Sequence, residues 1–185
     1  MKKEILYDQY RITGKWISHV SLWLLFKNRS FRKIYYFRKL QESHGITYKF
    51  YHILNFLLQK KISIELPRTI KLGKGFKILH PYSITLNGSC VIGDNFTILK
   101  GATIGESKTG KIGAPVIGNN VYVGLNSTVV GGIHIGNDVM IAANTFVNFD
   151  VPDGALVMGS PGVIHIKNKA SQPHLSNSIL NIDKL

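Results

Sequence analysis

One histidine stands where its imidazole could act on a bound molecule. His80 lies two residues after Ile78, in the segment Ile78-Leu79-His80-Pro81. An imidazole has a pKa of about 6.5, so near neutral pH it can remove the proton of a hydroxyl group that attacks a carbonyl carbon. The sequence therefore offers His80 as a candidate general base.

The other histidines and the single cysteine carry weaker signals. His19, His44 and His52 fall in the expected helical part, His134 and His165 at turn or exit positions, and His174 in the C-terminal tail. Cys90 is the only cysteine, which excludes an internal disulfide and agrees with a reducing cytoplasm. A nucleophilic thiol needs an adjacent base, and we expect Cys90 to be structural.

A repeat must position His80. Thirteen aliphatic residues recur at a spacing of six, interrupted by a two-residue slip and by one insertion. They are Leu66, Leu72, Ile78 and Ile84, then Ile92, Ile98 and Ile104, then Ile117, Val123, Val129, Ile135, Ile141 and Val147. A period of six fits neither the helical period of about 3.6 nor the two-residue period of a strand. It predicts a parallel β-helix whose aliphatic side chains point inward and stack on one another.

Glycine directly follows many of these aliphatic positions. The six glycines are Gly73, Gly93, Gly105, Gly118, Gly124 and Gly136. We expect Gly and Asn at the corners of the coils because both tolerate the positive φ that tight turns require. His80, two residues after an inward position, should lie at a coil surface or corner.

The first third of the chain lacks the repeat and carries most of the charge. Residues 1–62 contain thirteen Lys and Arg against three acidic residues, a net of +10, whereas residues 63–185 have a net of +3. This segment is rich in aromatic residues and predicts helices, with Arg29, Arg32, Lys33, Arg38 and Lys39 interleaved. Two interpretations stay open: the helices lie on an anionic membrane with their basic side toward the headgroups, or they cap the open end of the β-helix. No recognised nucleic-acid-binding motif accompanies the charge, so we expect no nucleic-acid partner.

We expect neither a membrane-spanning segment nor a signal peptide. The longest mostly apolar run, Trp16 to Phe26, is interrupted by three polar residues and is half of the ~20 residues that a spanning helix needs. The expected location is the cytoplasm, and the membrane interpretation adds peripheral contact with the inner face of the membrane. The expected divisions are a helical segment at 1–62, the β-helix at 63–167 and a polar tail at 168–185.

An insertion breaks the repeat. The step from Ile104 to Ile117 is thirteen residues instead of six. Residues 107–115 within it are polar, contain two glycines and end in Pro115, which predicts an extruded loop. A repeat that serves only as a scaffold requires neither this loop nor His80.

The stretch from about Ile64 to Lys167 resembles the hexapeptide-repeat acyltransferases. The segment from His80 to Gly105 aligns with the family pattern without a gap, and Gly73-Lys74-Gly75 lies upstream. The resemblance implies a mainly β fold, a left-handed parallel β-helix of hexapeptide repeats with three hexads in each coil, preceded by the N-terminal α-helical segment. The thirteen hexads then make about four coils, plus any coil that the insertion hides.

The resemblance also implies a set of site residues. In the serine acetyltransferase-like branch, a His at this point of the motif is the catalytic base, which gives that role to His80. The Asp that orients this base corresponds to Glu65, eight residues before Gly73. Asn87 and Glu106 are expected near the same cleft, where they would bind the acceptor hydroxyl. In the family the inserted loop reaches over the active site of an adjacent subunit, so the expected assembly is a homotrimer.

The implied acetyl donor is acetyl-CoA, with no metal. In the family the donor lies in the groove between two β-helices of a trimer, beside small residues of the late coils. The corresponding cofactor-binding positions here are Gly124, Ala143, the exit segment Gly159, Ser160 and Pro161, and Lys167, which would meet a CoA phosphate. Leu125 replaces an Ala of the family and would narrow this groove.

The expected activity is an acetyl-CoA-dependent O-acetyltransferase acting on a sugar hydroxyl in surface polysaccharide biosynthesis, with a saccharide or lipid-linked saccharide as acceptor. Two departures from the serine enzymes favour this reading. Ala114 stands where those enzymes carry a second His before Pro115, and the helical segment is considerably shorter. The alternative enzyme is serine O-acetyltransferase, and the alternative from another class is a non-catalytic trimeric scaffold.

Overall fold

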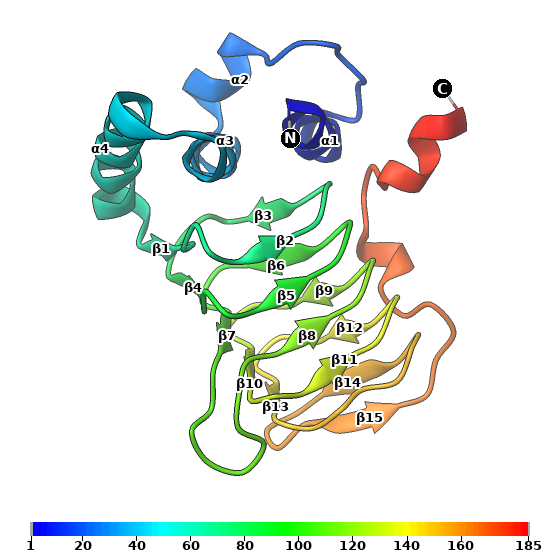
Figure 1. Ribbon diagram of the computed structural model, residues 1–185. Coiled ribbons are helices and arrows are strands. Elements are labelled where there is room, and N and C mark those ends of the chain that lie inside the picture. Colours follow the sequence, from blue (N-terminus) through cyan, green and yellow to red (C-terminus); the bar gives the residue numbers. More distant parts are fainter. Residues whose placement is uncertain (1, 185) are drawn as a thin grey trace.

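The computed structural model describes residues 2–184, and Figure 1 shows a three-sided β-helix with helices over one end. Sheet A contains β1 (Ile64–Glu65), β4 (Ile84–Leu86), β7 (Thr103–Gly105), β10 (Thr128–Val130) and β13 (Phe146–Val147). Sheet B contains β2 (Lys71–Leu72), β5 (Val91–Ile92), β8 (Val116–Ile117) and β11 (His134–Ile135). Sheet C contains β3 (Lys77–Leu79), β6 (Thr97–Leu99), β9 (Tyr122–Val123), β12 (Met140–Ile141), β14 (Leu156–Met158) and β15 (Val163–His165). The predicted parallel β-helix with an N-terminal helical segment is confirmed.

The chain passes through the sheets in the order A, B, C and back to A, so each coil turns three corners. We name these the A–B, B–C and C–A corners after the sheets they join. All neighbouring strands pair in parallel except β14 and β15, which pair antiparallel at the C-terminal end. Five strands in sheet A mean five coils, one of which carries the insertion.

The aliphatic hexad residues form the core. Twelve of the thirteen are buried, and Leu72, which is half-buried, packs against the same cluster. Ile78, Ile98, Val123, Ile141 and Val157 stand in register along sheet C. The inward stacking that the six-residue period predicts is therefore observed.

The two-residue slip after Ile84 has a simple cause. Strand β4 points two aliphatic residues inward, and both Ile84 and Leu86 are buried. Ile84 pairs with Ile64 of the coil above, whereas Leu86 pairs with Ile104 of the coil below. The slip thus keeps the inward column of sheet A continuous.

The six glycines after the aliphatic residues serve a different purpose from the one predicted. None of them has a positive φ. Instead, a Cβ on Gly118 would lie 2.8 Å from Oδ1 of Asn137, and a Cβ on Gly124 would lie 2.6 Å from the backbone nitrogen of Ala143. Five of the six glycines are required because the next coil approaches closely, which leaves no room for a side chain. The exception is Gly105, where a Cβ would lie 3.2 Å from Cγ1 of Val130.

Asparagine and aspartate supply much of the positive φ at the corners. Asn95, Asn120 and Asp138, at the B–C corner, have φ between 55° and 58°. Their side chains form a ladder: Asn95 Nδ2 donates to Asn120 Oδ1 at 2.9 Å, and Asn120 Nδ2 donates to Asp138 Oδ1 at 3.1 Å. The expected role of Asn in the turns is confirmed, since Asn and Asp tolerate the left-handed region better than most residues.

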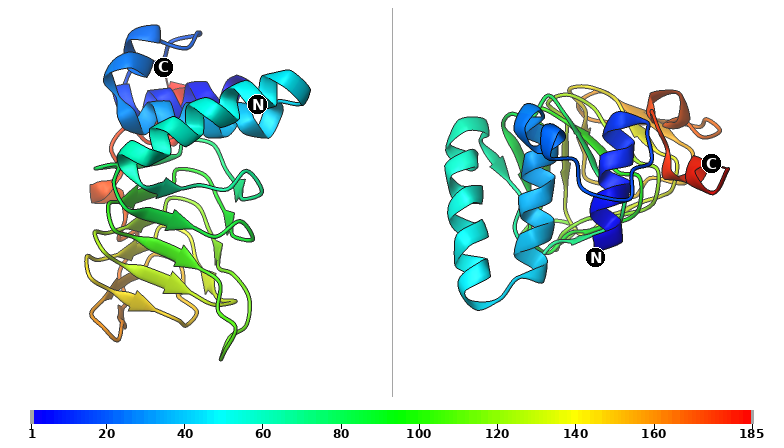
Figure 2. Two further views of the ribbon diagram at one scale, coloured as in Figure 1. Left: turned by 90° about the vertical axis from the view of Figure 1, so that its left-hand side faces the viewer. Right: turned by 90° about the horizontal axis from the view of Figure 1, so that it is seen from above.

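Four helices cover the N-terminal end of the β-helix (Figure 2). They are α1 (Lys2–Thr13), α2 (Leu22–Lys27), α3 (Arg29–Glu42) and α4 (Gly45–Ile62). Ile34 and Phe37 of α3 are buried in the same hydrophobic cluster as the β-helix core. The helices therefore continue the core of the solenoid beyond its first coil.

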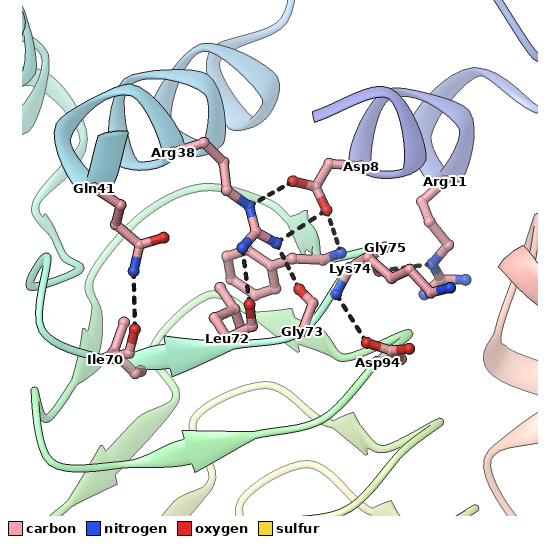
Figure 3. A network of polar contacts seen from close by, with 11 residues as sticks. Asp8, Arg11, Arg38, Gln41, Ile70, Leu72, Gly73, Lys74, Gly75 and Asp94 are labelled. Carbon is pink, nitrogen blue, oxygen red and sulfur yellow. Dashed lines mark hydrogen bonds and ion pairs between the residues drawn. The ribbon is translucent and has the colours of Figure 1, made fainter. Parts of the chain in front are cut away.

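A buried polar network ties α1 and α3 to the first coil (Figure 3). Arg38 donates to Asp8 at 2.9 Å and to the carbonyl oxygens of Leu72 and Gly73 at 2.8 and 2.5 Å. Asp8 Oδ1 accepts from the backbone nitrogen of Phe76 at 2.7 Å. These carbonyl and amide groups belong to the coil that has no further coil above it. Arg38 and Asp8 supply hydrogen bonds to backbone groups that would otherwise be buried without partners.

The structure favours the capping interpretation of the basic helices. Lys33 and Arg38, two of the five interleaved basic residues, are buried, and so is Arg11. Burial lowers the pKa of Arg11 to about 10 and that of Lys33 to about 8. A basic side turned toward lipid headgroups is not what α3 presents. No helix among residues 2–184 is long and apolar enough to cross a membrane.

The C-terminal tail runs back along the B–C corner to the helices. It includes two 3-10 helices, η1 (Gln172–His174) and η2 (Ile179–Lys184). Arg11 Nη1 donates to the carbonyl oxygen of Ser176 at 2.6 Å, and Lys77 Nζ donates to its hydroxyl at 2.6 Å. The tail thus fastens α1 to the side of the solenoid.

We predict that Arg38→Met lowers the free energy of unfolding by about 3–5 kcal/mol, because it leaves a buried carboxylate and two carbonyl groups without their partner. Urea denaturation at pH 7 measures this. The matched control is Arg68→Met, whose guanidinium is exposed over the ring of Tyr48. That control should cost less than about 1 kcal/mol. Equal stability of the two variants would contradict the role given to Arg38.

Candidate active site

His80 lies in the turn that joins β3 to β4, at the C–A corner. It has a φ of 54°, and its carbonyl oxygen accepts from the backbone nitrogen of Tyr82 at 2.8 Å. The residue is exposed. A histidine in the left-handed region is uncommon, and such a conformation is kept only where surrounding structure fixes it. The turn therefore holds the imidazole outward, as predicted, at the end of the solenoid nearest the helices.

The turns of the C–A corner form one continuous column below His80. The backbone nitrogen of Gly101 donates to the carbonyl oxygen of Tyr82 at 3.1 Å, and that of Asn126 donates to Lys100 at 3.1 Å. Further down, the backbone nitrogen of Asn144 donates to the carbonyl oxygen of Leu125 at 2.7 Å, and that of Phe146 donates to the carbonyl oxygen of Gly159 at 3.0 Å. This column brings His80 into line with predicted cofactor-binding residues, namely Gly124, Ala143, Gly159, Ser160 and Pro161.

The lower part of this column is built from small, accessible residues. Ala143, Gly159, Ser160 and Pro161 are exposed. Gly124 lies directly against the next coil, where any side chain would displace the backbone of Ala143. Leu125 is half-buried beside it. Such a column can take an extended ligand close to the backbone and direct its far end toward His80.

Glu65 lies near the upper end of the same sheet edge but is not bonded to His80. It points outward from β1, paired with Thr85, and no hydrogen bond joins it to His80 within residues 2–184. It lines a groove of about 340 Å³ with Phe56, Gln59, Lys60 and Ser63. Its carboxylate also opposes the fall in the pKa of Lys33 that burial causes. Because Glu65 is not hydrogen-bonded to His80, its role in orienting the imidazole stays a proposal.

Asn87 and Glu106 lie at the A–B corner, at the opposite end of sheet A from His80. Asn87 Oδ1 accepts from the backbone nitrogen of Ser89 at 2.8 Å, so its side chain stabilises its own turn. Glu106 is exposed at the start of the inserted loop. The structure brings these two residues together on adjacent coils and separates both from His80 of the same chain.

Lys167 also lies away from the column. It follows β15, and its carbonyl oxygen approaches Gly154 at the B–C corner, where a Cβ on that glycine would lie 3.1 Å away. Its side chain is exposed. Within one chain, therefore, Lys167 does not join the other residues predicted to bind the cofactor.

The inserted loop follows the A–B corner of its own chain, away from the helices (Figure 1). Ser107 and Gly113 exchange backbone hydrogen bonds of 2.9 and 3.0 Å at its base. Lys111 Nζ contacts Asp150 Oδ2 at 2.5 Å, and this bond holds the pKa of Asp150 below its usual value. Ile112, beside Lys111, is exposed. The loop and His80 thus occupy different corners of the same solenoid.

Two cations beside His80 escaped the sequence reasoning. Leu79 pairs with Leu99, which places Lys100 in the turn directly below His80, and Lys100 is exposed. Arg29 of α3 donates to the hydroxyl of Tyr82 at 2.7 Å. The coil repeat could have revealed Lys100, because it is the position equivalent to His80 one coil later. Arg29 comes from another element, and no local pattern marks it.

Among known proteins, the chain is similar to serine acetyltransferases. The chain is 36% identical over 133 residues to serine acetyltransferases of Staphylococcus aureus and Staphylococcus epidermidis, a match that covers 66% of this chain and 62% of each relative. The chain thus matches less than two thirds of the length of these relatives. No family model matches.

Solved structures share the fold. A serine acetyltransferase of Brucella abortus has a TM-score of 0.74 at 21% identity, covering 90% of this chain and 69% of that one. The same enzyme in complex with coenzyme A gives 0.72 at 22% identity, covering 90% and 68%. The Neisseria gonorrhoeae enzyme in complex with serine gives 0.68 at 26% identity, covering 89% and 68%.

These relatives overturn one expectation. The sequence reading placed sugar O-acetylation first and serine O-acetylation second, but the relatives and the structural neighbours are serine acetyltransferases. The polysaccharide reading is therefore wrong, and the saccharide acceptor goes with it. It rested on Ala114 and on the short helical segment, two departures that do not remove the likeness of the rest of the chain.

Cys90 offers a test of the expectation that it is structural. Burial raises the pKa of its thiol to about 11, and the side chain is 1% exposed. We predict that a thiol reagent such as Ellman's reagent leaves the native chain unmodified and labels it once in denaturant, because only the exposed thiolate reacts. Fast labelling of the native chain would contradict the described packing around Cys90.

Proposed function

We propose that this chain is a hexapeptide-repeat acyltransferase that transfers the acetyl group of acetyl-CoA to the hydroxyl of serine. The observation that carries the proposal is the C–A corner. This corner holds the exposed His80 in a fixed turn. The turns stacked below His80 lead, coil by coil, to the small residues that the resemblance assigns to the donor. The similarity to serine acetyltransferases supports serine as the acceptor.

His80 acts as the general base in this proposal. Its neutral imidazole takes the proton of the serine hydroxyl while the oxygen attacks the thioester carbonyl carbon. The C–S bond then breaks, the acetyl group stays on the serine oxygen, and the protonated imidazole returns the proton to the leaving CoA sulfur. No acyl-enzyme is formed, so Cys90 takes no part.

The donor lies along the lower column, with its thioester toward His80. Gly124 and Ala143 leave space for a pantetheine arm next to the backbone, and the exit segment Gly159, Ser160 and Pro161 would flank its adenosine end. Lys100, directly below His80, would attract a negatively charged donor to the same corner. These assignments make the column a site for a long, thin anionic ligand.

The assembly in this proposal is a homotrimer in which two chains complete each site. Within one chain, His80 lies at the C–A corner whereas the loop, Asn87 and Glu106 lie at the A–B corner. A neighbour that turns its A–B corner toward the C–A corner of the first chain would bring these groups together. Ile112, exposed in the loop, would then be covered by a neighbouring chain.

The first test is the reaction itself. The purified chain is incubated with acetyl-CoA and L-serine, and both CoA release and O-acetylserine are measured, the second by mass spectrometry. L-Alanine, which has no hydroxyl, is the control acceptor. Ala114 supplies no imidazole to the acceptor, so we expect weak binding of serine and therefore a high KM. The absence of O-acetylserine at saturating L-serine would refute the proposal.

We predict that His80→Ala lowers kcat by roughly 10²–10⁴-fold, the usual contribution of a general base. Binding of CoA should change little, because the donor lies mainly along later coils. His134→Ala is the matched control, since His134 is also exposed but belongs to sheet B. Turnover of His80→Ala close to that of His134→Ala would remove His80 from the base role.

Light scattering tests the assembly. We predict a mass three times that of the 20.7 kDa chain at working concentration. A second measurement on His80→Ala should give the same mass, because the residue is exposed and its removal affects chemistry alone. A mass near that of a single chain would contradict the shared site.

A further inference from the structure

Helix α4 has two apolar faces, and only one of them is covered. Leu58 and Ile62 are buried, and Tyr51 packs against Tyr35 and Tyr36 of α3. On the opposite side, Ile46, Phe50, Ile53 and Leu57 are 83%, 57%, 57% and 52% exposed. Their spacing of four, three and four residues places them in one line along the helix. A surface helix of a globular protein normally carries polar residues on that side.

The charged residues of α4 are all basic and lie beside this apolar stripe. The helix contains Lys49, Lys60 and Lys61 and no Asp or Glu. At about 100° per residue, these three lysines fall within roughly 70° of the centre line of the stripe, on both sides of it. Lys60 also lies 4.7 Å from the centre of the Phe56 ring, whose side chain is half exposed. An apolar stripe flanked by lysines is the pattern of a helix that lies in a lipid–water interface.

Helix α2 repeats the pattern at the same end of the molecule (Figure 2). Leu22, Trp23 and Phe26 are exposed, and Lys27 follows them. No acidic residue occurs between Asp8 and Glu42, or between Glu42 and Glu65. Both α2 and α4 therefore present exposed apolar side chains next to positive charge.

We propose that the outer face of α4, with α2 beside it, binds the surface of an anionic lipid bilayer. The stripe would enter the boundary between headgroups and acyl chains, and the flanking lysines would meet anionic headgroups. Lys33 and Arg38 of α3 do not serve this purpose, since both are buried. The contact depends instead on apolar residues that no other part of residues 2–184 covers.

Charge distinguishes this occupant from a second copy of the chain. Two α4 helices packed along their stripes would bring together two surfaces whose charged residues, Lys49, Lys60 and Lys61, are all basic. Like charges at a helix interface are unfavourable, and α4 offers no carboxylate to compensate them. An anionic bilayer complements both the apolar stripe and its basic margins.

Vesicle flotation with the full-length chain tests the proposal. The chain is mixed with vesicles of phosphatidylcholine alone, or of phosphatidylcholine with phosphatidylglycerol, at low and at high salt. We expect it to float with the anionic vesicles at low salt and less as salt rises, because screening weakens the lysine contribution. Lys60→Gln/Lys61→Gln should lower the partition coefficient about fivefold per lysine at low salt.

Removing the stripe gives the decisive comparison. Phe50→Ser/Ile53→Ser should lower partition at least tenfold at either salt, without a change in melting temperature, because both side chains are exposed. The control is Leu180→Ser, a 60% exposed leucine in the tail, which should bind like the wild type. Failure of the wild-type chain to float with anionic vesicles, or equal flotation of Phe50→Ser/Ile53→Ser, would overturn the proposal. So would a wild-type mass in light scattering that falls in Phe50→Ser/Ile53→Ser, since a second copy would then cover the stripe.

Discussion

A coil of a parallel β-helix buries its aliphatic side chains and pairs its backbone only where another layer covers it. Each inner coil has a neighbour on both sides, but the first coil of this chain has none above it. Here α1 and α3 take the place of the missing coil. Ile34 and Phe37 continue its core, and Arg38 and Asp8 bond to its carbonyl and amide groups. Because His80 directly follows β3, the last strand of this first coil, its position depends on this cap.

The same constraint organises the candidate site. Coils stack about 4.8 Å apart, so residues at equivalent turns form columns with a fixed spacing. The turns of the C–A corner are joined by backbone hydrogen bonds from Tyr82 down to Gly159. A long ligand laid along this column meets repeated backbone geometry, and only the first turn presents an imidazole. In the proposed function the chemistry is therefore local to His80, whereas donor binding is spread over several coils.

Much of this arrangement could be predicted from the sequence, because a six-residue period states which side chains point inward. The hexads, the loop at 107–115 and the outward position of His80 all follow from counting along the chain. The role of the glycines was mistaken, since periodicity does not distinguish a positive φ from a close approach between coils. Glu65, Asn87, Glu106 and Lys167 were assigned by resemblance. Their corners become visible only when the strands are placed, and three of them lie away from His80. The acceptor was wrong for a related reason: Ala114 is one contact, and the fold and sequence of the remaining chain carry more weight.

The central claim is the proposal that two chains complete one site, and it rests on the separation of His80 from the inserted loop. Co-expression of two inactive variants tests it most directly. One carries His80→Ala, and in the other two glycines replace residues 108–112, a length that suits the hydrogen-bonded pair of Ser107 and Gly113 as the base of a hairpin. Mixed assemblies contain sites that combine an intact His80 of one chain with an intact loop of its neighbour. The account predicts that the co-expressed pair regains acetyl transfer that neither variant shows alone. An inactive pair in confirmed mixed assemblies, or full activity of the loop variant alone, would contradict it.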